Sequence, residues 1–284
     1  MRSEAPLGVF DSGLGGLSIA REIRRLLPRE RILYFADTAW CPYGGRPVAE
    51  IRGRSLAVGR ELMARGAKAL VVACNTASGA ALEALRECLP LPVIGTEPAV
   101  KPAVRSSRSH RIGVIATTAT ATSHRLARLL QNHCAGASMV VQPCPGLADL
   151  VEAGETDGEQ VRQRLQELLA PLRAAEVDTV VLGCTHYPFV RDAIQEVMGP
   201  EVELVDSGAA VARQTERVLR ERDLLAQESA GGFVLLTTGD IRAVGKVARR
   251  LWGETLDVER IQEVEGGSSQ RRSTGGAPAG GSSR

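Results

Sequence analysis

The sequence predicts an α/β protein built from two similar α/β domains, each with a mainly parallel sheet. Three observations indicate this architecture. Apolar, strand-like runs alternate with amphipathic helical patterns along the chain, which favours parallel sheets covered by helices. Strand ends recur in the same order at nearly constant spacing. The chain has 284 residues, 44% hydrophobic and 24% charged, which suffices for two globular domains of ordinary size.

Each expected strand is a short apolar run that ends in small or polar residues. In chain order, the expected strands cover residues 7–11, 31–36, 68–73, 92–95, 111–116, 138–142, 178–182, 202–206 and 232–237. Apolar residues at helical spacing occupy the intervals, as in 47–65 and 158–174. Because the carboxyl ends of parallel strands share one edge of a sheet, we expect the functional residues at these ends.

Three pairs of strand ends indicate an internal duplication. The run 8–12 resembles 113–117, and 92–96 resembles 203–207. Between these paired runs, each half also has a β-branched apolar run that ends in a cysteine. These cysteines, Cys74 and Cys184, are 110 residues apart. Agreement in both order and spacing predicts two halves related by a pseudo-twofold duplication, with a cleft between them.

The repeat boundaries predict how the chain is divided. Residues 1–98 and 208–265 are expected to form the first domain, because the last strand and helix have no counterpart in the second repeat. Residues 99–207 are expected to form the second domain. In 266–284, Gly or Ser occupies 11 of 19 positions, which predicts a disordered tail.

Composition and cysteine usage argue against several classes of protein. A formal net charge of +2 gives no indication of a nucleic-acid or membrane partner. The segment before the first strand has no long apolar run, so we expect no signal peptide, no transmembrane helix and a cytoplasmic location. The six cysteines are then expected to be reduced. No clustered His/Cys spacing predicts a metal site.

Two of the cysteines are candidate reactive thiols. Cys74 and Cys184 each follow a predicted strand and precede a helical pattern. A helix N-terminus stabilises a thiolate, so we expect an enlarged thiolate fraction at both positions. The other cysteines include one whose role stays open, Cys41, and three expected to be small buried side chains, Cys88, Cys134 and Cys144.

Six strings, in this order, resemble the glutamate racemases and the related two-cysteine racemases. They are Phe10-Asp11-Ser12-Gly13-Leu14-Gly15-Gly16-Leu17, Asp37-Thr38, Pro42-Tyr43-Gly44, Cys74-Asn75-Thr76-Ala77-Ser78, Pro145-Gly146-Leu147-Ala148-Asp149-Leu150-Val151-Glu152 and Gly183-Cys184-Thr185-His186-Tyr187-Pro188. The resemblance runs from about residue 7 to 260. It implies a cofactor-independent enzyme with its active site in the cleft between two α/β domains. Such an enzyme interconverts L- and D-glutamate and supplies D-glutamate for peptidoglycan.

Racemisation requires that a proton leave one face of Cα and that another arrive at the opposite face. Two fixed acid–base groups meet this requirement, and the resemblance assigns these roles to Cys74 and Cys184. It also implies that Asp11 assists Cys74 and that His186, tuned by Glu152, assists Cys184. From the residues alone, a helix cap for Asp11 and a solvated helix face for Glu152 stay open.

The substrate is expected to be held by hydroxyl, amide and backbone donors near helix starts, where anions are favoured. The candidates are Asp11, Ser12, Tyr43, Gly44, Asn75, Thr76, Thr117, Thr120, Thr185 and His186. For Thr117 and Thr120, helix capping is an equal alternative. The resemblance implies glutamate as the small-molecule partner, no cofactor, and a homodimer.

Three alternatives stay open. A pyridoxal-phosphate racemase needs a Schiff-base lysine. The only lysines are Lys68, Lys101 and Lys246, and none lies in a recognisable phosphate-binding context. A second alternative is a racemase of the same superfamily that acts on aspartate, a hydantoin or another small acid. A third is a non-catalytic binding protein that retains the fold.

Overall fold

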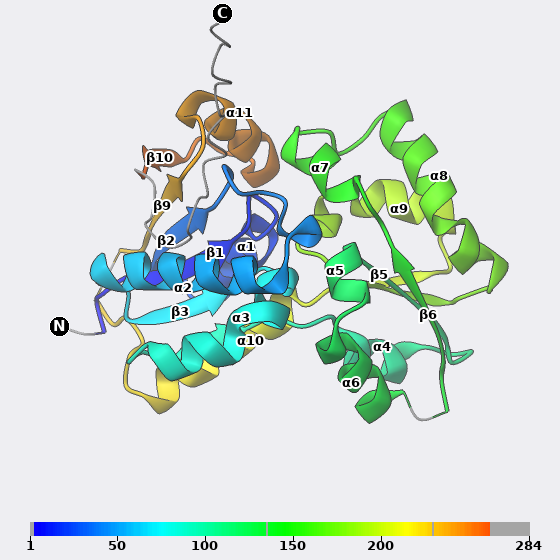
Figure 1. The fold of residues 1–284 in the computed structure, drawn as a ribbon, viewed down its shortest axis with the longest axis horizontal. Coiled ribbons are helices and arrows are strands. Elements are labelled where there is room, and N and C mark those ends of the chain that lie inside the picture. Colours follow the sequence, from blue (N-terminus) through cyan, green and yellow to red (C-terminus); the bar gives the residue numbers. More distant parts are fainter. Residues whose placement is uncertain (1–2, 135, 229, 262–284) are drawn as a thin grey trace, which may run out of the picture.

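The computed structural model describes residues 3–134, 136–228 and 230–261. Its strands form two separate sheets, one in each lobe of Figure 1. The larger sheet has six parallel strands in the order β10-β9-β2-β1-β3-β4. Its strands are β1 (Leu7–Asp11), β2 (Arg31–Ala36), β3 (Ala69–Val72), β4 (Val93–Gly95), β9 (Gly232–Thr237) and β10 (Asp257–Arg260).

The smaller sheet has four parallel strands in the order β6-β5-β7-β8. Its strands are β5 (Arg111–Ala116), β6 (Ser138–Pro143), β7 (Thr179–Leu182) and β8 (Glu203–Val205). This order repeats β2-β1-β3-β4 of the larger sheet. The register repeats as well, since Gly8 lies opposite Leu70 and Gly113 lies opposite Val180. The matching order and register support the predicted duplication.

Helices connect the strands, as crossovers between parallel strands require. They are α1 (Leu17–Leu26), α2 (Val48–Ala64), α3 (Asn75–Cys88), α4 (Val100–Ser106), α5 (Thr118–Ala121), α6 (His124–His133), α7 (Leu147–Glu152), α8 (Glu159–Ala174), α9 (Arg191–Met198), α10 (Gly208–Glu221) and α11 (Ile241–Trp252). Two 3₁₀ turns, η1 (Tyr43–Gly45) and η2 (Tyr187–Val190), follow β2 and β7. Figure 1 shows α1, α2, α3, α10 and α11 around the larger sheet.

The larger sheet is covered on both faces because its strand residues alternate between two cores. In β1, Val9 packs in the core that contains Ile23 of α1 and Leu219 of α10. The next residue, Phe10, packs in the opposite core with Val58 of α2. All five side chains are fully buried. The strand ends therefore form a fixed edge that carries the polar residues.

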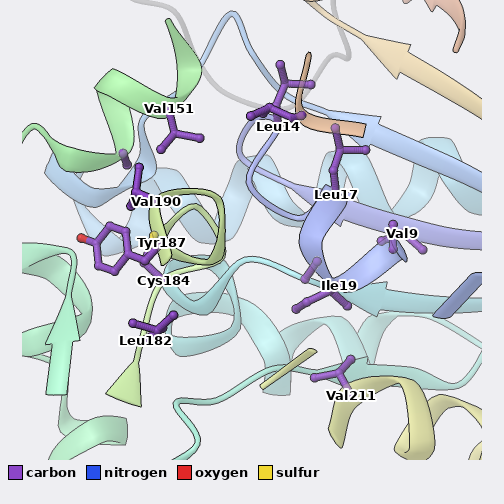
Figure 2. Packing of buried hydrophobic residues seen from close by; sticks show 14 of the residues in the cluster. Val9, Leu14, Leu17, Ile19, Val151, Leu182, Cys184, Tyr187, Val190 and Val211 are labelled. Atoms are coloured by element: carbon purple, nitrogen blue, oxygen red, sulfur yellow. The ribbon is translucent and has the colours of Figure 1, made fainter. Parts of the chain in front are cut away.

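The first of these cores continues across the boundary between the lobes. Leu14 and Leu17 of the first lobe share it with Val151 and Tyr187 of the second, as Figure 2 shows. The chain crosses between the sheets after β4 and again after β8. At these crossings the hydroxyls of Thr96 and Ser207 are hydrogen-bonded at 3.2 Å. The lobes thus meet through a continuous apolar contact and a buried polar link.

The α/β class and both parallel sheets are confirmed. Each expected strand lies within one residue of its predicted bounds, and α2 and α8 match the expected helices 47–65 and 158–174 equally closely. The sequence did not predict β10, a charged strand at the edge of the sheet. The boundaries of the two domains stay a prediction, and the tail 266–284 lies outside the described residues.

One cysteine differs from its expected position. Cys88 is exposed at the end of α3, so the expectation of a buried thiol there is wrong. The apolar face of this helix is already supplied by Leu82 and Leu85, and the last turn points to solvent. Cys144 is buried as expected, and Cys134 is half-buried. Within the described ranges, none of the helices combines the length and apolarity that crossing a bilayer needs.

Candidate active site

Cys74 lies where β3 gives way to α3. It is the N-cap residue of the helix, and its Sγ accepts a hydrogen bond from the backbone N–H of Ala77 at 3.4 Å. Its thiol also lies 3.7 Å from the hydroxyl of Ser12. The helix terminus therefore reaches the sulfur as expected. Burial is the larger effect, however, and raises the pKa of Cys74 to about 12, with the carboxylate of Asp11 adding to the rise. The expectation of an enlarged thiolate fraction is wrong for Cys74.

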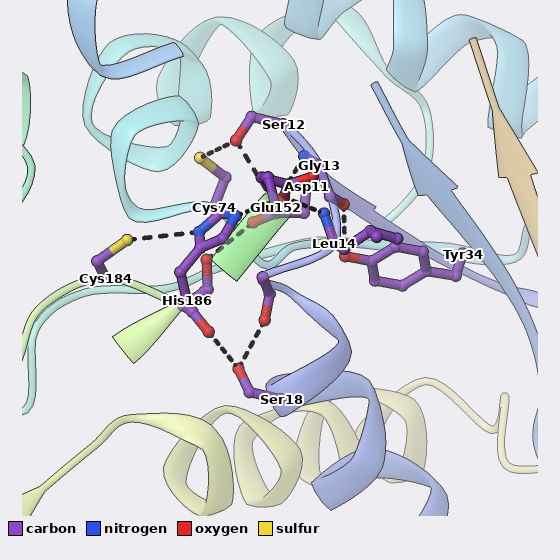
Figure 3. A network of polar contacts seen from close by, with 12 residues as sticks. Asp11, Ser12, Gly13, Leu14, Ser18, Tyr34, Cys74, Glu152, Cys184 and His186 are labelled. Carbon is purple, nitrogen blue, oxygen red and sulfur yellow. Dashed lines mark hydrogen bonds and ion pairs between the residues drawn. The ribbon is translucent and has the colours of Figure 1, made fainter. Parts of the chain in front are cut away.

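Cys184 follows β7, the strand that corresponds to β3 in the second sheet. Its Sγ lies 3.6 Å from Nδ1 of His186. On the other side of the ring, Nε2 of His186 lies 2.6 Å from Oε1 of Glu152, at the end of α7. The same carboxylate oxygen accepts the backbone N–H of Leu14 at 2.6 Å. Thiol, imidazole and carboxylate therefore form a continuous chain, drawn in Figure 3.

The imidazole of His186 is tuned to hold a proton. Burial opposes the charged ring, but hydrogen bonds and charge interactions with Cys184 and Glu152 outweigh burial and raise the pKa of His186 well above its usual value. The Glu152 carboxylate favours a proton on Nε2, which leaves Nδ1 free to accept the proton of the Cys184 thiol. This pair can therefore become a thiolate beside an imidazolium.

Asp11 lies at the end of β1 and is fully buried. One of its oxygens accepts the hydroxyl of Thr185 at 3.0 Å, and the other accepts the N–H of Gly13 at 2.8 Å. The hydroxyl of Ser12 reaches this second oxygen at 3.5 Å. Ser12 therefore connects the thiol of Cys74 to the carboxyl of Asp11. Burial raises the pKa of Asp11, while His186 opposes that rise.

The glycines after β1 permit this close approach. A Cβ built on Gly15 would lie 2.3 Å from the ring of His186, and one on Gly13 would lie 2.2 Å from Oε1 of Glu152. Either contact is closer than real Cβ atoms allow. The turn is further held by Ser18, whose hydroxyl donates to the backbone carbonyl of Thr185 at 2.8 Å. Backbone from the first lobe thus packs directly on catalytic candidates of the second.

A cluster of three hydroxyls joins the two lobes at another point. Thr76 of α3 lies 3.0 Å from Thr117 and 3.2 Å from Thr120, measured between their Oγ1 atoms. Thr117 also caps α5, since its Oγ1 accepts the N–H of Thr120 at 3.3 Å. Gly44 lies against this cluster, because a Cβ at that position would approach Cβ of Thr117 to 3.1 Å. The capping and ligand roles of Thr117 are compatible in this geometry.

Asn75 differs from its neighbours because its side chain has no hydrogen-bond partner among the described residues. Both Nδ2 and Oδ1 are buried, and neither is paired with a group in the described part of the chain. An unpaired buried amide is costly by about 1–3 kcal/mol, so such groups are rare unless they serve a ligand. The position next to Cys74, at the start of α3, makes Asn75 the strongest structural candidate for a substrate contact.

The hydroxyl of Tyr43 forms a hydrogen bond within the protein and is not available to bind substrate. It donates to Asp37 at 2.6 Å, and Asp37 also forms a buried ion pair with Arg54 at 2.7 Å. This arrangement fixes the segment that carries η1. Substrate contacts from Tyr43 and Gly44 would therefore come from their backbone groups.

Some residues near the site were not predicted. Ser18, the backbone of Leu14 and the Asp37–Arg54 pair all hold site elements in place. Of these, Leu14 and Asp37 lie in the strings that resemble the racemases, whereas Ser18 and Arg54 carried no sequence signal. Cys41, left open above, has its sulfur close to Glu152 and His186.

The chain matches known proteins over most of its length. The sequence model of the Asp/Glu/Hydantoin racemase family matches residues 12–215. A glutamate racemase of Ectopseudomonas mendocina (strain ymp) is 47% identical over 258 residues, which cover 90% of this chain and 98% of that protein.

Two solved structures have the same fold. The Escherichia coli glutamate racemase, in complex with L-glutamate and the activator UDP-MurNAc-ala, has a TM-score of 0.81 and 33% identity, and the match covers 90% of this chain and 98% of that one. The Francisella tularensis glutamate racemase, in complex with D-glutamate, has a TM-score of 0.81 and 28% identity, covering 92% and 98%. The sequence matches, and the paired strand-end cysteines, show that this chain belongs to the Asp/Glu/Hydantoin racemase family, among its glutamate racemases.

Proposed function

We propose that this chain interconverts L- and D-glutamate without a cofactor, with Cys74 and Cys184 as the two acid–base groups. The observation that carries the proposal is the pair of buried thiols at equivalent strand ends of two matching sheets. Each thiol has its own polar chain, so each can exchange a proton independently. The likeness to glutamate racemases over about 90% of the chain supports glutamate as the substrate.

In one direction, Cys184 gives its proton to Nδ1 of His186 and becomes the base. The thiolate removes the Cα proton of the substrate, and the thiol of Cys74 delivers a proton to the opposite face. The Cα–H bond breaks on one side and forms on the other, so no redox partner is needed. After one turnover Cys74 is the thiolate and Cys184 the thiol, which is the arrangement required for the reverse direction.

When the reverse direction starts from an enzyme in which Cys74 is a thiol, Cys74 must first lose its proton. Ser12 lies between the Cys74 thiol and the Asp11 carboxyl, at 3.7 Å and 3.5 Å, and can pass the proton along. The raised pKa of Asp11 brings this carboxyl closer to the range in which a general base is effective. Asp11 then acts on Cys74 through Ser12.

The carbanion that forms at Cα is a strong base, so the substrate must be held and its charge stabilised. The unpaired amide of Asn75 is suited to a substrate carboxylate or ammonium group. Hydroxyls of Thr76, Thr117 and Thr120 lie in one cluster beside it. Thr185 adds a hydroxyl next to Cys184.

We further propose that the enzyme works in the cytoplasm as a homodimer and supplies D-glutamate for peptidoglycan. The likeness to glutamate racemases supports this supply role, and the Escherichia coli relative was solved with the activator UDP-MurNAc-ala. The domain division into 1–98 with 208–265 and 99–207 is part of this proposal, because it places one thiol in each domain.

A circular dichroism assay of purified protein with L- and D-glutamate, without added cofactor, tests the function. We expect both enantiomers to approach the racemic mixture at rates that a chelator does not change, and no absorbance band from pyridoxal phosphate. Aspartate should react far more slowly. Equal or faster turnover of aspartate would assign another substrate, and inertness toward every amino acid tested would favour a binding protein.

A further inference from the structure

Cys41 and two side chains of the candidate active site together have the donor atoms of a metal site. The ligand atoms of Cys41, Glu152 and His186 all lie within 4.8 Å of one another. Ligands on a tetrahedral zinc ion are separated by about 3.3–3.8 Å, given zinc bond lengths of about 2.0–2.3 Å. Shifts of about 1 Å would therefore bring the three atoms to one ion. We propose that Zn²⁺ binds here and inhibits the enzyme.

The geometry around Gly13 supports a common point of convergence. A Cβ at Gly13 would lie 2.2 Å from Oε1 of Glu152 and 2.9 Å from Sγ of Cys41. Both donor atoms therefore face the same small volume, next to Nε2 of His186. A side chain at Gly13 would collide with both atoms, so the glycine is what allows them to lie this close together.

The donor set and the local charge select the ion. One thiolate, one imidazole and one carboxylate form a mixed S, N, O set that suits Zn²⁺ and not Mg²⁺ or Ca²⁺. The carboxylates of Glu152 and Asp11 place negative charge beside the Cys41 thiol, which favours a cation at this position. Binding releases the thiol proton of Cys41 to solvent.

A cavity gives access to the cluster. It measures about 280 Å³, and its lining includes Cys41, Glu152 and Asp149 together with Val244 and Val247 of α11. An ion can therefore reach Cys41 and Glu152 from the α11 side. The fourth coordination position would be filled by water from this cavity.

The consequence for turnover follows from the two nitrogens of His186. To bind a metal through Nε2, the ring must give up the proton that Glu152 favours there and carry its single proton on Nδ1. Nδ1 then cannot accept the proton of the Cys184 thiol, which lies 3.6 Å away. The ion also takes Glu152 from the imidazole. Zn²⁺ should therefore lower kcat with little change in KM, and a chelator should restore the rate.

The effect on turnover depends on the proposed racemase function, whereas metal binding does not. Binding is therefore measured separately, with Co²⁺ as the spectroscopic substitute for Zn²⁺. Wild-type protein should take up one equivalent and develop a thiolate-to-cobalt charge-transfer band. Cys41→Ser should lack the band, and Cys134→Ser, which changes a thiol outside the cluster, should keep it. A folded wild-type protein without the band, or a band that persists in Cys41→Ser, overturns the site.

Inhibition by Zn²⁺ is then compared in the same three proteins. Cys41→Ser should keep its basal activity and need at least about 10–100-fold more Zn²⁺ for half inhibition, the scale reported for loss of even an outer-shell partner. Cys41→Ala gives the same test if the serine variant does not fold. Equal inhibition of wild type and both Cys41 variants, competitive with glutamate, would place the ion on the catalytic thiols and overturn the proposal.

Discussion

Replacing Glu152 by Gln tests how the carboxylate tunes His186. The change keeps the size of the side chain but removes its charge. Oε1 of Glu152 accepts two hydrogen bonds at 2.6 Å, and the side chain is only 18% exposed, so solvent screens the charge weakly. A charge-assisted hydrogen bond contributes about 1.5–3 kcal/mol and a neutral one about 1 kcal/mol. We take the loss as about 1.4 kcal/mol, and we expect the pKa of His186 to fall toward its usual value.

The rate of racemisation should fall by an amount that matches this loss of hydrogen-bond energy. We expect kcat/KM to fall by roughly tenfold, because the imidazolium that forms beside the Cys184 thiolate is less stable. The fall must be equal in the two directions, since the products are enantiomers and the equilibrium constant is one. The assay is circular dichroism from each enantiomer. Glu155→Gln, an exposed carboxylate three residues away, is the matched control and should retain wild-type rates.

Urea unfolding gives an independent readout. A raised pKa in the folded state stabilises the protein fully below the pKa of an unfolded histidine, about 6.5, and this stabilisation disappears as the pH rises through the pKa of folded His186. The free energy of unfolding should therefore differ most between wild type and Glu152→Gln near or below that value. The difference should shrink at alkaline pH. Wild-type kinetics with a stability difference that is independent of pH would refute the tuning role.

Three further predictions concern other parts of the site. Asn75→Ala should raise KM for glutamate by roughly tenfold, the value of one hydrogen bond of about 1.4 kcal/mol, with little change in urea stability. Gly15→Ala should lower kcat because its Cβ displaces the ring of His186, whereas Gly79→Ala, in open space on α3, should be neutral or stabilising. His186→Asn and Asp11→Asn should each lower kcat by about 10²-fold or more, with opposite bias between the two directions. Equal kcat losses in both directions would contradict the assignment of Asp11 to Cys74 and of His186 to Cys184.

The strands could be predicted because their signal is local. Buried parallel strands are continuous apolar runs, and the matching runs before Cys74 and Cys184 also disclosed the repeated topology. The strand β10 has no such run, since Asp257–Arg260 carries charges and pairs on one side only, with β9. Edge strands of this kind resemble loops in sequence.

Within the site, residue types were predictable but their connections were not. Ser12 was expected as a substrate donor, yet its hydroxyl lies between Cys74 and Asp11, a contact set by packing residues that are 62 positions apart. The hydroxyl of Tyr43 is taken by Asp37 for a similar reason. The pKa of Cys74 depends on the balance of burial against a helix terminus, and only the three-dimensional structure reveals how complete that burial is.

The central claim is that the two thiols act on opposite faces of Cα. It is tested most directly by solvent deuterium exchange in Cys74→Ser and Cys184→Ser, with Cys134→Ser as control. Both active-site variants should lose racemisation of both enantiomers by orders of magnitude. Each should still exchange the Cα hydrogen of one enantiomer without inverting it, and the two variants should exchange opposite enantiomers. Wild-type racemisation in either variant, or exchange of the same enantiomer by both, would contradict the two-thiol mechanism.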